Sequence, residues 1–225
     1  MNNPLLHPFE TLHQAAPFSA IETQHFLPAL QAAITQAQEE LEALVGQTEP
    51  PNFENTIERL DSLGELLDRN AALLYNLNAA ETTPELQKVT QEAAPLLSDF
   101  QNTLRLDPHL FERIKYVHEH TDKALLTKEQ QTLLEKQYKG FTRNGALLNS
   151  EQKEQLRKID TELAQLSLTF GEHVLADTQN YSLHLTDAND LKGLPQAVID
   201  AAAETAQQRA LDGWVFTLDY PSYMP

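Results

Sequence analysis

Apolar side chains recur at steps of three or four over most of this chain, which is the spacing of one face of an α-helix. The clearest series starts after two prolines, where Asn52 is suited to cap a helix N-terminus, and it continues to about Asn78. Its apolar members are Phe53, Ile57, Leu60, Leu63, Leu67, Ala71, Leu74 and Leu77. The pattern therefore predicts one long packed helix from 52 to 78.

Similar series predict helices on both sides of this segment. They cover about 22–45, 83–104, 107–117, 127–147 and 149–177. Pro95 falls inside one of these patterns and is expected to kink or divide that helix. The short connection between the last two segments predicts that they form an antiparallel pair of helices.

The two ends of the chain follow other patterns. Prolines exclude a long element from residues 1–20, and Phe9, Leu12 and Phe18 are expected to hold this arm in order against the core. Near the other end, apolar and polar residues alternate at 181–186 and at 214–219, which is typical of strands. An alanine-rich helix beginning at Pro195 separates these strands, and they are expected to pair.

The predicted fold is therefore mainly α. It is an antiparallel bundle of about six or seven helices, with a small two-stranded antiparallel element near the C-terminus. We expect residues 1–225 to form a single helical domain. Its parts are an irregular arm at 1–20, the bundle at 21–178 and a strand–helix–strand segment at 179–225.

Charge and composition narrow the classes of partner. The 225 residues carry 16 Lys and Arg against 33 Asp and Glu, a net charge of −17. This balance argues against nucleic acid and anionic lipid as partners. A solvated exterior is favoured over a binding surface for basic peptides. No secretory signal and no apolar stretch of ~20 residues is visible, so neither secretion nor a membrane partner is expected. The chain has no cysteine, which excludes disulfides and thiolate metal sites.

No residue pattern points to a reaction. None of the eight histidines is followed by another at i+4, so the H-E-x-x-H zinc motif is missing. His118-Glu119-His120 is the nearest to a ligand cluster, but residues two apart on a helix point about 200° apart, and surface residues at a helix end are favoured. His173 and Asp177 have the spacing of a tuned general base, yet no nucleophile accompanies them, and an ordinary surface contact is favoured. We therefore predict no catalytic, cofactor-binding or metal-binding residue in this chain.

Several motifs follow one another in an order found in a known family. They are HFLPA at His25 to Ala29, PNFENTIERL at Pro51 to Leu60, FTRNGALL at Phe141 to Leu148, IDTELAQLSLTFGEHVL at Ile159 to Leu175 and DGWVFTLDYPSYMP at Asp212 to Pro225. In order and spacing the chain resembles the N-terminal helical region of thimet-oligopeptidase-type zinc metallopeptidases, most of all the bacterial branch of oligopeptidase A and peptidyl-dipeptidases.

The resemblance implies that this segment takes no part in the cleavage reaction itself. In that family this region is mainly helical and forms one wall of a deep channel, while zinc-activated water cleaves short peptides in a catalytic domain further downstream. The expected partners are that domain and short peptides, the expected compartment is the cytoplasm, and the segment alone is expected to be inactive. The alternative is a free-standing helical interaction or scaffold module without peptidase activity, and the reading frame after Pro225 would distinguish the two.

Overall fold

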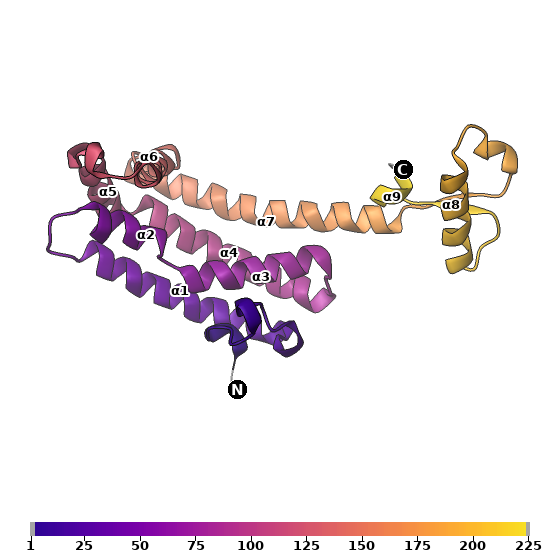
Figure 1. Ribbon diagram of the computed structural model, residues 1–225, viewed down its shortest axis with the longest axis horizontal. Helices are drawn as coiled ribbons and strands as arrows, with labels where there is room; N and C mark the ends of the chain where they lie inside the picture. Colours follow the sequence, from indigo (N-terminus) through magenta and orange to yellow (C-terminus); the bar gives the residue numbers. More distant parts are fainter. Residues whose placement is uncertain (1–2, 224–225) are drawn as a thin grey trace. The chain divides into compact units, whose positions relative to one another are not determined.

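The computed structural model describes residues 3–223, and the chain contains two compact units, Met1–Gln165 and Leu166–Pro225 (Figure 1). The first unit is built from helices, and the last helix of the set below continues into the second unit. The helices are α1 (Thr23–Val45), α2 (Arg59–Asp61), α3 (Glu65–Ala80), α4 (Pro84–Leu106), α5 (Pro108–His120), α6 (Lys128–Arg143) and α7 (Ser150–Asn180). The predicted, mainly α fold class is confirmed. The prediction of one domain over 1–225, with the parts 1–20, 21–178 and 179–225, stays a prediction.

Helix α1 forms where the sequence predicts it. Glu22 precedes it, and the backbone N–H of Glu22 donates to Nδ1 of His25 at 3.0 Å, which satisfies a polar group at the helix start. Pro28 lies early in the helix, and Gly46 follows its last residue. The apolar face is buried through Phe26, Ala29, Leu30, Ala33, Ala37, Leu41 and Leu44. This face contributes to the core on which α3 and α4 pack.

The prediction of a single helix over 52–78 is wrong, because the helix is interrupted at Gly64. A π-helical turn, η4 (Phe53–Glu58), leads into the short α2, and α3 starts only at Glu65. Gly64 has φ +77°, a conformation that a residue without a Cβ adopts readily. Its backbone N–H donates to Oε2 of Glu40 at 2.9 Å. The predicted cap at Asn52 is confirmed, since its side chain accepts from the backbone N–H of Asn55 at 2.8 Å.

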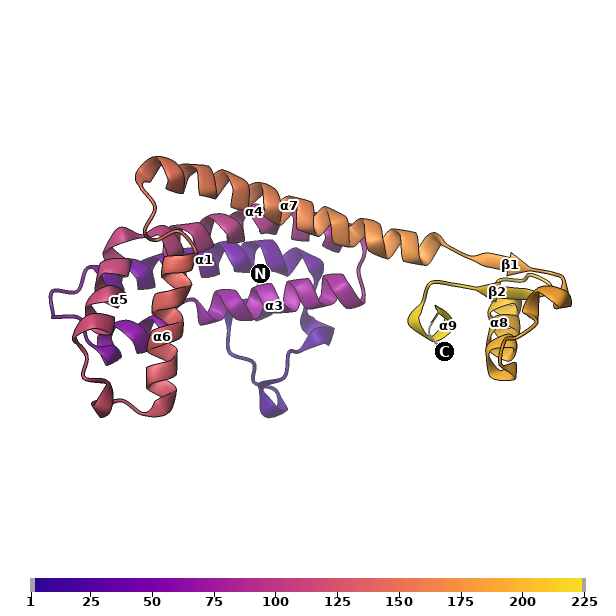
Figure 2. The same cartoon turned by 90° about the horizontal axis from the view of Figure 1, so that it is seen from above.

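Two further expectations concern the effect of Pro95 and the pairing of the last two predicted bundle helices. Pro95 lies inside α4 without dividing it. The antiparallel pair predicted for 127–147 and 149–177 is wrong: Figure 2 shows α6 steeply inclined to α7, so that only the end of α6 lies near the start of α7. The connection turns through Gly145 at φ +100°, where an added Cβ would lie 2.6 Å from Cδ2 of Leu156. The backbone here therefore requires glycine, and it redirects the chain.

Two apolar clusters form the core of the first unit. One joins the end of α1 with η4, α5 and α6, and its fully buried members are Ile57, Leu110, Ile114, Val117 and Leu134. The other joins α1, α3 and α4 with the N-terminal arm. Leu5 anchors this arm, because its side chain is fully buried and its carbonyl accepts from Nη2 of Arg69 at 2.7 Å and from Nδ2 of Asn70 at 3.2 Å.

Of the three residues expected to hold the arm against the core, only Phe9 does so. Its short 3₁₀ turns are η1 (Pro4–Leu6), η2 (Leu12–Gln14) and η3 (Phe18–Ala20). Phe9 packs on the core and lies under the guanidinium of Arg69, 4.3 Å from Cζ to the ring centroid. Leu12 and Phe18 are exposed, so the expectation that they hold the arm is wrong. The burial of Leu5 in a 3₁₀ turn does this instead.

In the second unit, the predicted antiparallel sheet is confirmed. Strands β1 (Leu183–Leu185) and β2 (Trp214–Phe216) pair with Leu185 opposite Trp214. Helix α8 (Gln196–Gln208) packs on β2, and α9 (Tyr220–Tyr223) follows. In the second strand Val215 is buried, whereas its aromatic neighbours Trp214 and Phe216 are partly exposed. The buried residues of α8 are Ala202 and Ala206. The last two residues of the motif at Asp212 to Pro225 lie outside the described residues.

Candidate functional site

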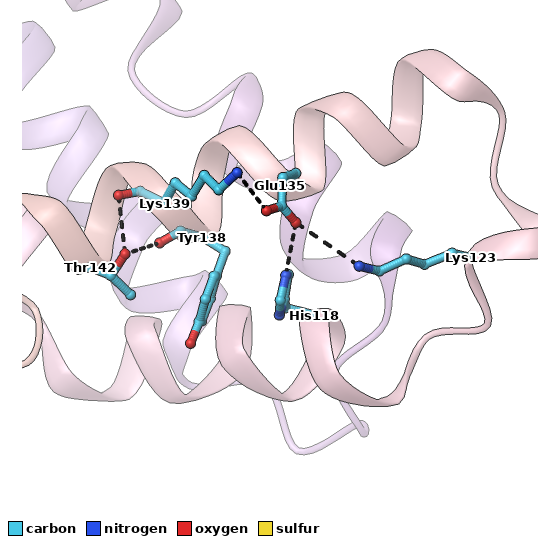
Figure 3. Close-up of polar contacts among 6 residues, drawn as sticks. All are labelled: His118, Lys123, Glu135, Tyr138, Lys139 and Thr142. Carbon is cyan, nitrogen blue, oxygen red and sulfur yellow. Dashed lines mark hydrogen bonds and ion pairs between the residues drawn. The ribbon is translucent and has the colours of Figure 1, made fainter.

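A polar cluster between α5 and α6 is the most connected group of titratable side chains in the described residues (Figure 3). Its centre is Glu135, whose Oε2 lies 3.0 Å from Nε2 of His118 and whose Oε1 lies 2.9 Å from Nζ of Lys139. Lys123, on the short η5 turn (Lys123–Leu125), places its Nζ 4.0 Å from the same carboxylate. The ring of His118 stacks on Tyr138 with centroids 4.0 Å apart. The three elements are therefore joined through one carboxylate.

The electrostatics of this cluster keep Glu135 ionised. The hydrogen bond from Lys139, followed by the hydrogen bond with His118, lowers the pKa of Glu135 to about 2. Such a group accepts hydrogen bonds but is a weak base near neutral pH. The nearby hydroxyl of Thr142 donates instead to backbone carbonyls one turn earlier in α6. The cluster therefore lacks the nucleophile–base pair that covalent catalysis needs.

The histidines around Glu119 do not converge. His118 faces Glu135, whereas His120 places its Nδ1 2.9 Å from the carbonyl of Tyr116 and stacks on that ring. The helical geometry expected for this segment is confirmed, since α5 extends to His120. Nowhere in residues 3–223 do three His, Cys, Asp or Glu side chains gather closely enough to hold a metal ion. The described side chains therefore offer no site for a metal ion, and the family resemblance itself places the zinc ion in another part of the enzyme.

The other spacing noted in the sequence, His173 with Asp177, lies on α7. Among the described residues, no hydrogen bond or ion pair joins these two side chains, so their i, i+4 spacing forms no histidine–carboxylate pair here. The ordinary contact that we favoured for them is not formed either.

The PNFENT motif proves to be a structural joint centred on a buried arginine. Arg113 of α5 donates to Oδ1 of Asn55 at 3.3 Å, to Oγ1 of Thr56 at 3.4 Å, and to both the carbonyl and the side chain of Gln47 at 3.3 Å. Burial lowers the pKa of Arg113. All these acceptors are neutral. Sequence reasoning missed this residue, although an arginine inside the apolar stretch of α5 was the available signal.

A second missed feature is a hollow at the α6–α7 turn within the first unit. It has a volume of about 350 Å³ and is lined in part by Arg105, Arg143, Leu148 and Asp160. It follows from the turn at Gly145, which places the FTRNGALL segment at its edge. The lining also includes Thr142, whose hydroxyl donates to backbone carbonyls of α6, and it includes no histidine, so the hollow holds no nucleophile–base pair of the kind that covalent catalysis needs.

An exposed apolar stripe follows one side of α7. It consists of Ile159, Leu163, Leu166, Phe170 and Val174, and each is between 50% and 71% exposed. The steps of four, three, four and four residues place them on one face of the helix. No residue of α7 is buried. Contiguous apolar surface of this kind marks an interaction site in most proteins. We call it the α7 stripe.

Within the described part of the chain, no helix is both long enough and apolar enough to cross a membrane.

Comparison with known sequences gives matches along the whole chain. The family described as "Neurolysin/Thimet oligopeptidase, N-terminal domain" matches residues 30–153. Oligopeptidase A of Escherichia coli is 30% identical over the full chain, which covers 32% of that protein. A "Probable cytosolic oligopeptidase A" of Arabidopsis thaliana is 30% identical with the same coverages, and the dipeptidyl carboxypeptidase of Escherichia coli is 30% identical over 96% of the chain and 32% of its own length. The chain thus spans about a third of the length of the curated relatives it matches.

Proposed function

The chain belongs to the neurolysin and thimet oligopeptidase family, as its N-terminal domain, and from this we propose that it is the non-catalytic part of a zinc-dependent oligopeptidase. In this proposal residues 1–225 form one wall of a channel that admits short peptides. The zinc ion and the water that it activates belong to a part of the enzyme outside these residues. We place the enzyme in the cytoplasm, with neither a nucleic acid nor a membrane as partner.

The observation that carries the proposal is the α7 stripe. Five large apolar side chains on one helix face are exposed, with Phe170 at 71%. Burying such side chains stabilises a protein by roughly 1.5–3 kcal/mol each, which makes an uncovered row of them unfavourable. The relatives are about three times as long as this chain, so they contain polypeptide that is able to cover an equivalent surface. We infer that the catalytic part of the enzyme packs on the α7 stripe.

The wall that we propose must hold its shape as peptides enter. The Arg113 joint and the two apolar clusters support this. The joint and the first cluster hold α1, η4, α5 and α6 together, and the second cluster holds α1, α3 and α4 together. A rigid wall restricts access to extended peptides and excludes folded proteins. No residue of this chain is assigned a part in peptide-bond cleavage.

The proposal is tested first on the gene and then on its product. We expect an H-E-x-x-H motif in the reading frame downstream of Pro225, and we expect the complete product to cleave a quenched fluorescent peptide of about ten residues. A zinc chelator should abolish this cleavage, and residues 1–225 alone should show none. A stop codon after Pro225 would instead favour the free-standing interaction module, and zinc-dependent cleavage by residues 1–225 alone would place the active site in this chain.

A second experiment tests the proposed cover over the α7 stripe. In the complete product, Leu166→Ser with Phe170→Ser should lower the melting temperature and the peptidase activity, because the interface loses apolar contact. Leu125→Ser is the matched control, since Leu125 is 82% exposed and lies on η5 rather than on α7. Equal behaviour of the control and the double variant would contradict the assignment of the α7 stripe as an interface.

A further inference from the structure

The charges of this chain are distributed unevenly. Residues 123–143 contain five Lys and Arg and two Glu, a net charge of +3, whereas the other 204 residues have a net charge of −20. This segment comprises η5 and α6. One short segment of the first unit is therefore a basic island on an acidic protein.

The lysines of this segment line one hollow on the outside of α6. The hollow has a volume of about 610 Å³, and its lining includes Lys123, Lys128, Lys136 and Lys139. The three from α6 lie at steps of eight and three residues, which places them on one side of that helix. Thr132 and Glu135 complete this side of the lining. We call these four lysines the lysine patch.

The patch already holds one carboxylate. Figure 3 shows Lys123 and Lys139 pointing at Glu135 from opposite directions, with Nζ atoms 4.0 and 2.9 Å from its oxygens. Lys128 and Lys136 have no carboxylate partner among the described residues and are exposed. Two ammonium groups therefore remain beside a carboxylate that its own neighbours already neutralise.

We propose that the lysine patch binds a short carboxylate-rich segment of a peptide or protein. The type of anion follows from the surroundings. At physiological salt the attraction between exposed charges extends only about 8 Å. The lysine patch therefore attracts an acidic segment that is no longer than the patch itself. A nucleic acid, with phosphates along its whole length, would meet the −20 carried by the rest of the chain. The patch lining also offers compact ammonium groups and no arginine, the residue that recognises phosphate in a two-pronged geometry.

This inference is independent of the proposed peptidase role, and its test measures binding alone. A dye-labelled twelve-residue peptide with six glutamates is titrated with the 225-residue protein, and binding is followed by fluorescence anisotropy. The comparison probes are the same peptide with glutamine in place of each glutamate, and a single-stranded DNA of twelve thymidines. The test variant is Lys128→Gln with Lys136→Gln, which leaves the ion pairs of Glu135 in place. The control is Lys158→Gln with Lys192→Gln, which changes the net charge by the same amount at two lysines that do not line the hollow.

We expect the glutamate peptide to bind, the glutamine peptide not to bind, and added salt to weaken the complex. The test variant should bind about five-fold more weakly, from the modest strength of two exposed ion pairs, and the control should change binding less than two-fold. Equal weakening in the two variants would overturn the proposal, because the attraction would then not reside in the patch. Tighter binding of the DNA than of the glutamate peptide would also overturn it and would assign the patch to phosphate. Far-UV circular dichroism checks that each variant keeps its helical content.

Discussion

The second unit offers a sharp test of the fold, because two of its glycines share a backbone conformation but not a neighbourhood. Gly213 has φ +85° and Gly193 has φ +96°, both in the region that residues with a Cβ rarely adopt. A Cβ added at Gly193 would meet nothing within 4 Å. A Cβ added at Gly213 would lie well inside 3.0 Å of the carbonyl oxygen of Leu185, on the paired strand β1. The pair of Gly→Ala substitutions therefore separates backbone strain from a steric clash.

The magnitudes follow from these two environments. The left-handed conformation costs an alanine roughly 1–2 kcal/mol, and this should be the whole effect of Gly193→Ala. Gly213→Ala carries the same strain and adds overpacking, which typically costs 1–3 kcal/mol. The clashing atom belongs to the backbone of β1, so relief requires β1 and β2 to separate rather than a side chain to rotate. We expect Gly213→Ala to lower the free energy of unfolding by about 2–5 kcal/mol in total.

The assay uses the single tryptophan of the chain as a local probe. Trp214 follows Gly213 directly and pairs with Leu185 in the sheet. Its fluorescence in a urea titration therefore reports unfolding of the second unit, while far-UV circular dichroism is dominated by the helices of the first. We expect the fluorescence midpoint to fall more for Gly213→Ala than for Gly193→Ala, with the main circular dichroism transition unchanged. Equal shifts of the fluorescence midpoint would refute the placement of Gly213 against β1.

Two further outcomes are expected. Ile57→Ala should lower the free energy of unfolding, measured by urea titration, by about 2–5 kcal/mol, because Ile57 is fully buried. Leu125→Ala, at an 82% exposed position, should change this free energy by less than about 0.5 kcal/mol. Similar losses in the two variants would contradict the assigned core. The pKa of Glu135 is about 2, so its contribution to stability is present above the ordinary value of 4.5 and disappears as the pH falls towards 2. Lys139→Met should return this pKa towards 4.5 in a carbon-detected NMR titration, and an unchanged pKa would show that His118 alone holds the carboxylate.

The helices were predictable because their signal is local. Steps of three and four residues, caps such as Asn52 and the change to alternation near 181–186 each depend only on neighbouring residues. The break at Gly64 was not predictable in this way. It depends on a contact between its backbone N–H and Glu40, 24 residues earlier, and an apolar series continues through it unchanged.

The two surfaces that we propose to be functional were less predictable for the same reason. The lysines of 123–143 look like ordinary helix charges in the sequence, and only the fold shows that they line one hollow and share Glu135. The residues of the α7 stripe have the spacing of core residues, although they are exposed. Periodicity indicates that a face needs cover, and it does not indicate what covers it.

The joint at Arg113 has a consequence for how the first unit responds to acid. Each of its partners, from Gln47, Asn55 and Thr56, is an amide, a hydroxyl or a carbonyl, and none of these gains a proton between pH 2 and pH 8. The contact of α5 with α6 through Glu135, by contrast, weakens as that carboxylate is protonated. Acidification should therefore weaken the contact of α5 with α6 first and leave the contact of α5 with the PNFENT turn intact. The helices of this unit should then separate in a defined order as the pH falls.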